Sequence, residues 1–313
     1  IQDALQVLFN GSSSLAFFPS DVAMLYSIVN KIDPTIEPDT FNQLLQASAP
    51  TPANLRELIS LHDSIRNLLL PEKSKLSIEG SEDLLNAAVD TLLAIRNKYP
   101  DGSLRIESLV GKTFGSIVGL ATNGDADVYA YRYALKELKP FAIFGPAYIY
   151  SSYVDRGDFA LYNADNETGL TDKWIEARAR FLEVLIRYNI ADGEISLNDI
   201  GGYFEDQRLG IKIGSPTGGP RPRSVFADDT NPTPVIGFAG DDFLFGGSGN
   251  DTITANDGNN YAEGGGGNDT ITGGSGTDQF YGGAGIDSLF GGGGVDILFG
   301  GKDDDHIDGG SGN

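Results

Sequence analysis

The sequence predicts a chain of two unlike parts, an α-rich (α+β) N-terminal domain over residues 1–213 and an array of short strands and turns over residues 237–313. In the first part, apolar residues recur at the three- and four-residue spacing of amphipathic helices. The second part holds 25 of the 42 glycines and repeats with a fixed period of nine. Glycine at three of nine positions disfavours a helix, because each costs about 1 kcal/mol relative to alanine.

The expected helices of the first part begin at recognisable residues. Ser20 caps a helix whose apolar face carries Val22, Leu25, Tyr26 and Val29. Pro38 lies in the first turn of the next helix, because its missing N–H costs nothing there. Two further helices are expected over residues 51–69 and 81–92, opened by Thr51-Pro52 and capped by Ser81.

The rest of the first part combines helices with one strand. A helix over residues 125–139 is expected to end at Pro140, and the aromatic and β-branched run of residues 141–153 predicts a strand. Thr171 is expected to cap a long helix. Residues 214–236 are rich in proline and glycine and are expected to be a linker or a cap strand.

Composition excludes several classes of function. The chain has no cysteine, which excludes disulfide frameworks, thiolate catalysis and sulfur-based zinc sites. Lys and Arg number 22 against 44 Asp and Glu, a net charge of −22 that repels nucleic acid and anionic membranes. Cations are therefore the expected small partners. No apolar run is long enough to predict an integral membrane segment.

The repeats of residues 237–313 share two features. In frame they read GFAGDDFLF, GGSGNDTIT, ANDGNNYAE, GGGGNDTIT, GGSGTDQFY, GGAGIDSLF, GGGGVDILF and GGKDDDHID, followed by GGSGN. Position six is Asp in every complete repeat except the third, which has Asn260, and position eight is always apolar. This pattern predicts a turn followed by a short strand with one inward side chain.

The turns have the chemistry of a calcium site. Their glycines allow positive φ and let backbone carbonyls approach a common point, while position six supplies a carboxylate. Ca²⁺ takes six to eight such oxygens in adaptable geometry, whereas Mg²⁺ demands a strict octahedron. The expected metal-site residues are Asp242, Gly247, Gly249, Asp251, Gly265, Gly267, Asp269, Gly274, Gly276, Asp278, Gly283, Gly285, Asp287, Gly292, Gly294, Asp296 and Asp305.

The nonads match G-G-x-G-x-D-x-U-x, so this region resembles the RTX (repeats-in-toxin, haemolysin-type calcium-binding) family of type I secreted bacterial proteins. The resemblance implies a parallel β-roll in which successive repeats alternate between two sheets. It also implies several Ca²⁺ ions held between turns two repeats apart, such as residues 246–251 and 264–269. A secreted or cell-surface location and contact with type I secretion machinery are implied as well.

The alternative for a tract of glycine and aspartate is a disordered linker or acidic tail. It is disfavoured because a linker keeps no register of apolar residues, but it is expected to hold without Ca²⁺, when the carboxylates repel one another. Residues that break the repeat pattern are expected to weaken the turns that contain them. These are Phe238 in the first repeat, Asn256 and Asn260 in the third, and Asp303 in the last.

No catalytic residue is assigned within the chain. Ser116 has the wrong spacing for a nucleophile elbow, and His62 lies on an apolar helix face. Gly111-Lys112-Thr113 lacks the first glycine of a phosphate loop and predicts a helix-end turn. Acidic stretches at Asp165 and Asp192 lack ligands or the glycine that an EF-hand needs.

The segments AYRYALKELKPFAIFG, TDKWIEARARFLEVLI and YFEDQRLGIKI resemble the spacer of RTX proteins with a lipase-like region. This resemblance implies a serine-hydrolase domain before Ile1, and the repeat interrupted at Asn313 predicts further repeats. Two hypotheses for the whole protein remain open. One is a secreted toxin or lipase-like exoprotein whose repeats bind Ca²⁺ and fold on export, and the other is a calcium-dependent surface adhesin without catalysis.

Overall fold

The computed structural model describes residues 19–32, 37–46, 95, 97–99, 102–124, 127–163, 169–190, 201–215, 221–228 and 234–312. The chain forms two compact units. One comprises residues 1–109, 125–134 and 141–152, and the other comprises residues 110–124, 135–140 and 153–313. The helices expected over residues 51–69 and 81–92 lie outside the described residues, as do His62 and the acidic stretches that begin at Asp165 and Asp192.

The first unit packs helices against a two-stranded antiparallel sheet. Its elements include α2 (Pro19–Ile32), α3 (Pro38–Gln46), β1 (Arg105–Ser108) and β2 (Phe141–Phe144). The ring of Tyr26 meets Phe41 and Phe141 edge to face at 5.3 and 5.0 Å. The side chain of Asn42 bonds both the N–H and the C=O of Ile106, at 2.9 and 2.8 Å, and so fastens α3 to β1.

Two local expectations for the first part of the chain were wrong. The strand expected over residues 141–153 ends at Phe144, and a 3₁₀ helix (Ala147–Tyr150) and α9 (Ser151–Val154) follow, because Pro146 has no N–H for a ladder and begins a helical turn instead. The Gly111-Lys112-Thr113 turn begins α7 (Phe114–Thr122) rather than ending a helix. Its threonine hydroxyl accepts a hydrogen bond from the N–H of Ser116 at 3.3 Å.

Two other helix expectations were confirmed, the first in shorter form, whereas Ser20 lies inside α2 and does not cap it. The helix expected over residues 125–139 is α8 (Val128–Lys136), and the helix capped by Thr171 is α10 (Asp172–Ile190). The Thr171 hydroxyl accepts from the N–H of Trp174 at 3.0 Å. Among the helices that the structure describes, none combines the length and apolar character needed to cross a membrane.

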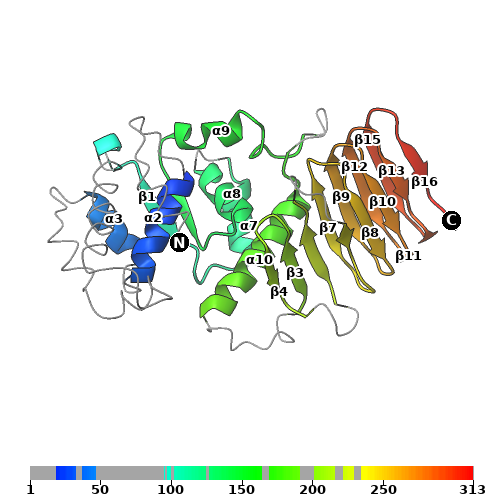
Figure 1. The fold of residues 1–313 in the computed structure, drawn as a ribbon, viewed down its shortest axis with the longest axis horizontal. Coiled ribbons are helices and arrows are strands. Elements are labelled where there is room, and N and C mark those ends of the chain that lie inside the picture. The colour runs from blue at the N-terminus through cyan, green and yellow to red at the C-terminus, as the bar shows by residue number, and fades with distance from the viewer. Residues whose placement is uncertain are drawn as a thin grey trace, which may run out of the picture. The chain divides into compact units, whose positions relative to one another are not determined.

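The second unit contains a parallel β-roll made of two sheets, as expected. One sheet has the order β15-β12-β9-β7-β5-β3-β4 and the other β16-β13-β10-β8-β6, so successive repeats alternate between them (Figure 1). The first contains β3 (Tyr203–Asp206), β4 (Ile211–Ile213), β5 (Arg223–Phe226), β7 (Phe243–Gly247), β9 (Tyr261–Gly266), β12 (Gln279–Ala284) and β15 (Ile297–Lys302). The second contains β6 (Val235–Ile236), β8 (Thr252–Asn256), β10 (Thr270–Gly273), β13 (Ser288–Phe290) and β16 (His306–Asp308). Two short strands, β11 (Ser275–Gly276) and β14 (Gly293–Gly294), pair with each other.

The position-eight side chains form the core between the two sheets. Neighbouring strands pair residues 18 apart, as Ala262 does with Phe280, so identical repeat positions stack in columns. The columns are fully buried at Leu244, Ala262 and Phe280 from one sheet and at Ile253, Ile271 and Leu289 from the other. Ile307, in β16, departs from the pattern and is 47% exposed, because no described strand pairs beyond β16.

The seven-stranded sheet continues upstream of the repeats. β5 and β6 lie within the segment expected to be a linker or cap, and β5 pairs in parallel with both β7 and β3. The ring of Phe226 stacks on Phe245 at 4.8 Å and is approached by Trp174 and Phe181 of α10. Helix α10 therefore packs on the N-terminal end of this sheet through aromatic side chains.

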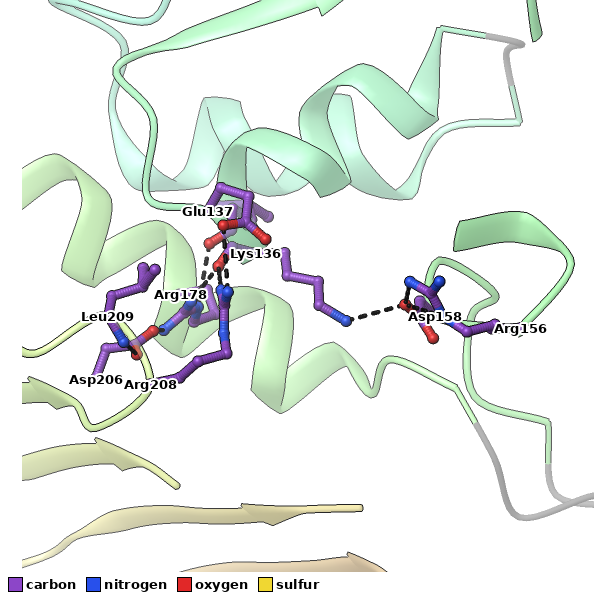
Figure 2. A network of polar contacts seen from close by, with 9 residues as sticks. Lys136, Glu137, Arg156, Asp158, Arg178, Asp206, Arg208 and Leu209 are labelled. Atoms are coloured by element: carbon purple, nitrogen blue, oxygen red, sulfur yellow. Dashed lines mark hydrogen bonds and ion pairs between the residues drawn. The ribbon is translucent and has the colours of Figure 1, made fainter. Parts of the chain in front are cut away.

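A buried ion pair joins α10 to β3 (Figure 2). Arg178 and Asp206 are each 2% exposed, and Nη1 of the arginine lies 2.6 Å from Oδ2 of the aspartate. The same guanidinium donates to the carbonyls of Leu135 and Lys136 and lies 4.4 Å from the ring centroid of Phe226. Burial lowers the pKa of Arg178, and the charge of Asp206 opposes that shift. Removal of the arginine would leave a buried carboxylate without its charged partner.

Replacing this arginine should destabilise the protein far more than replacing an exposed arginine on the same helix. Arg178→Met should lower the free energy of unfolding by about 3–5 kcal/mol. Arg180→Met, which removes an exposed pair with Glu176 and a contact with the Phe114 ring, should cost about 1 kcal/mol or less. Urea unfolding followed by the fluorescence of Trp174, the chain's single tryptophan, measures both. Equal losses would contradict the assigned role of Arg178.

The inward and outward faces of the seven-stranded sheet make a second comparison possible. Phe280 is fully buried in the core column, whereas Phe299 is 52% exposed and stacks on Tyr281 at 5.0 Å. In excess Ca²⁺, Phe280→Ala should therefore lower the unfolding free energy by about 3–5 kcal/mol and Phe299→Ala by about 1 kcal/mol. Urea titrations followed by far-UV circular dichroism check this. A larger loss at Phe299 would mean that the inward and outward faces are reversed.

Candidate calcium sites

The turns of the roll form two rows. The first row, residues 246–251, 264–269, 282–287 and 300–305, connects strands of the seven-stranded sheet to strands of the five-stranded sheet. The second row, residues 237–242, 255–260, 273–278 and 291–296, makes the return connections. Each turn therefore stacks on the turn 18 residues away, which brings together repeats two apart.

Glycine lets the turns of one row approach closely. Gly265 and Gly267, at positions two and four, have φ of 105° and 109°, a region that disfavours other residues. A Cβ on either would collide with the carbonyl oxygen of Gly247 or Gly249 in the preceding turn. At position one, a Cβ on Gly246 would lie 2.8 Å from Oδ2 of Asp251, so the carboxylate lies directly against the backbone.

The position-six carboxylates are held by a ladder of hydrogen bonds. Beyond the first turn of each row, Oδ1 of each accepts the backbone N–H of position six in the preceding turn. In the first row these bonds join Asp251 to Asp269, Asp269 to Asp287 and Asp287 to Asp305, at 2.7, 2.8 and 2.9 Å. In the second row, Asp278 receives the N–H of Asn260 and Asp296 that of Asp278. The ladder fixes each side chain and commits one of its oxygens.

The other oxygen of these carboxylates is buried without compensation. In Asp269, Asp278, Asp287 and Asp296, Oδ2 has no hydrogen-bond partner among the described residues. An unpaired buried polar group costs about 1–3 kcal/mol, and more when it is charged. Desolvation, aided by the charges of Asp287 and Asp251, raises the pKa of Asp269 to about 7. Burial also raises the pKa of Asp278 and Asp287. A nearby cation would stabilise the charged form of these carboxylates.

Asn260 shows what surrounds that second oxygen. Its Oδ1 accepts the N–H of Asp242 at 3.0 Å, which identifies the other terminal atom as Nδ2. Nδ2 donates to the carbonyls of Asn256 and Gly258, positions two and four of its own turn, at 3.1 and 3.4 Å. In a repeat with aspartate, the equivalent atom is a carboxylate oxygen. Because equivalent positions stack, we expect one carboxylate oxygen and two carbonyl oxygens to lie close together in those turns, a set that would suit Ca²⁺.

The structure places every expected site residue in these turns, with differences between them. Asp242 accepts from the N–H of Phe238 and of Arg223 at 2.5 and 2.7 Å, so both of its oxygens have partners. Asp305 is only half-buried. Asp303 replaces a position-four glycine and adopts φ of 74°. His306, expected to face outward, is exposed and lies beside the ring of Phe290 at 5.5 Å.

Sequence reasoning missed two features of the site. One is the ladder from position six to the turn 18 residues away. The other is a ladder at position five, where Asn250 Oδ1 accepts from the N–H of Asn268 and Asn268 Oδ1 from that of Ile286, at 2.8 and 3.0 Å. The recurring asparagines at position five were the available signal. Across the described chain, no three Asp, Glu or His side chains gather as a metal cluster.

Comparison with known proteins agrees with this geometry. Residues 236–271, 254–289 and 281–313 match the family model described as the RTX calcium-binding nonapeptide repeat. The chain matches none of the curated proteins with which it was compared. It likewise matches none of the solved structures. The matched segments coincide with the two-sheet roll and its turns, so residues 236–313 carry RTX nonapeptide repeats, a repeat type that binds Ca²⁺ at multiple sites.

Proposed function

We propose that residues 237–313 fold when they bind Ca²⁺ and that this coupling drives the folding of a secreted RTX protein outside the cell. The observation that carries the proposal is the buried, uncompensated Oδ2 of Asp269, Asp278, Asp287 and Asp296. In the proposed sites, the position-six aspartates and the carbonyls of positions two and four hold Ca²⁺ between turns of one row. Bound Ca²⁺ supplies positive charge that offsets the burial of the carboxylates.

Without a cation, the roll has little to stabilise it. Each nonad buries one position-eight side chain, whereas ordering each residue's backbone costs roughly 1–2 kcal/mol. The repeats also carry a net charge of −12, more than half of the chain's total of −22. Because the charge is concentrated on stacked turns, folding brings like charges together. Ca²⁺ binding free energy then becomes folding free energy.

This coupling accounts for folding on export. Cytosolic Ca²⁺ is too low to fill weak sites, so the repeats stay extended and can pass through a narrow secretion channel. Extracellular Ca²⁺ then folds them and opposes their return. The lipase-like resemblance of segments within residues 130–213 supports a toxin or lipase-like exoprotein with its catalytic domain before Ile1 as the whole protein. Ester hydrolysis that requires the preceding sequence would test that assignment.

Removal of calcium should unfold most of the repeats. In chelator, far-UV circular dichroism should show mostly disordered chain for the roll, and millimolar Ca²⁺ should add a strand signal because it neutralises the stacked carboxylates. The same concentration of Mg²⁺ should leave the spectrum near that in chelator, since its octahedral geometry suits these turns poorly. Identical spectra in chelator and in Ca²⁺ would refute the coupling.

A single carboxylate should matter only where it belongs to a site. Asp269→Asn should raise the Ca²⁺ concentration at the folding midpoint about tenfold or more, because it removes a charged ligand from the first row. Asp304→Asn removes the same charge from an exposed side chain and should shift the midpoint less than about twofold. Calcium titrations followed by circular dichroism compare them. Equal shifts would indicate a general charge effect instead of defined sites.

A further inference from the structure

We infer that the turn of the third repeat, residues 255–260, is closed by its own amide hydrogen bonds and takes no calcium. It then links the upstream strands to the calcium-binding turns without binding calcium itself. The inference rests on the proposed function, because it states which turn departs from it. It goes further because it places the side-chain amide of Asn260 at the position that Ca²⁺ is proposed to occupy in the other turns.

The first step of the argument concerns hydrogen-bonding capacity. Nδ2 of Asn260 donates to the carbonyls of Asn256 and Gly258, which an ion would otherwise need as ligands. Its Oδ1 already accepts from the N–H of Asp242. An amide NH₂ has no lone pair to offer a metal, and its hydrogens point where the metal would lie. The residues of this turn therefore do not fit Ca²⁺.

The second step concerns the neighbouring turn of the same row. Asn256 occupies position two with φ of 62°, a left-handed conformation that asparagine tolerates, and its Nδ2 donates to the carbonyl of Gly237 at 3.1 Å. In the turn of residues 237–242, both oxygens of Asp242 accept backbone N–H groups. The next aspartate of the row, Asp278, instead keeps a buried Oδ2 without a partner among the described residues. In the first two turns of this row, a side-chain amide and backbone N–H groups therefore bond the equivalents of the oxygens that Ca²⁺ would bind in later turns.

The third step concerns the strand that follows the turn. Glu263, at position nine of the third repeat, accepts a hydrogen bond from the hydroxyl of Thr171 at 2.6 Å and another from the phenol of Tyr261. Thr171 is also the residue that caps α10, through the N–H of Trp174. The third repeat is therefore bonded directly to a helix that Arg178 fastens to β3. Its attachment to the unit's upstream part needs no metal.

These contacts predict an order of folding. The neighbouring strands β3, β5, β7 and β9, the last of which follows the amide-closed turn, should persist at low Ca²⁺ and present an edge on which later repeats add. A preformed edge removes part of the nucleation cost that an isolated parallel array would otherwise bear. The calcium-dependent part then begins with the aspartates whose Oδ2 lacks a partner.

Calcium stoichiometry of the full chain, measured by calorimetry with CaCl₂, tests the inference. Asn256→Gly together with Asn260→Asp restores the repeat pattern in this turn and should add one Ca²⁺ per chain. Asp278→Asn, the reverse change in the next turn of the row, should lower the stoichiometry and shows that the method resolves one site. An unchanged value in the double variant, with wild type binding Ca²⁺, overturns the inference. No binding by wild type would instead overturn the proposed function.

Hydrogen exchange of the wild-type protein in chelator gives a second test that needs no variant. The amide hydrogens of Arg223 and Asp242, which donate to the side chains of Asp242 and Asn260, should remain protected. Those of Asp278 and Asp287 should exchange at rates typical of unfolded chain. Equal exchange at all four positions would overturn the inference even if Ca²⁺ later folds every repeat.

Discussion

The second unit depends on one electrostatic problem, which is how to bury a carboxylate oxygen among backbone carbonyl oxygens. The i+18 ladder holds Oδ1 of each aspartate in place, so the side chain cannot turn away from the turn it belongs to. In Asp269, Asp278, Asp287 and Asp296, Oδ2 has no hydrogen-bond partner among the described residues, and desolvation raises the pKa of Asp269 to about 7. The buried oxygen can be protonated, replaced by the NH₂ of an amide, or bound to a cation. Aspartate at neutral pH in a calcium-rich medium favours the cation.

The hydrophobic core follows from the same stacking. Strand register pairs residues 18 apart, so each position-eight side chain lies between equivalents from its own sheet and faces those of the other. The resulting column is narrow, with a single side chain from each repeat. This is why the metal and the core must act together. Neither a row of carboxylates nor a one-residue column would order nine-residue units alone.

The upstream end of the roll is stabilised differently. There the sheet continues through β5 and β3, the ring of Phe226 stacks on Phe245, and the buried pair of Arg178 and Asp206 fixes α10. Asn260 and Glu263 bring this mode of stabilisation into the third repeat itself. The third repeat therefore departs from the nonad pattern at the boundary between two parts of the roll. Packing and hydrogen bonds stabilise the upstream part, and Ca²⁺ is proposed to stabilise the rest.

The sequence by itself determined the period, the inward residue of each nonad and the oxygen chemistry of the turns, because these repeat locally and need no knowledge of distant contacts. It also located α8 and α10, whereas the strand over residues 141–153 was overextended across Pro146. Only the tertiary structure decided that β3 and β5 extend the roll, that Arg178 meets Asp206, and that the amide of Asn260 reaches two carbonyls. The strand pairing and the ion pair join residues about 20 or more apart in the chain, and the amide bonds depend on a side-chain rotamer. A local pattern of residue types specifies neither.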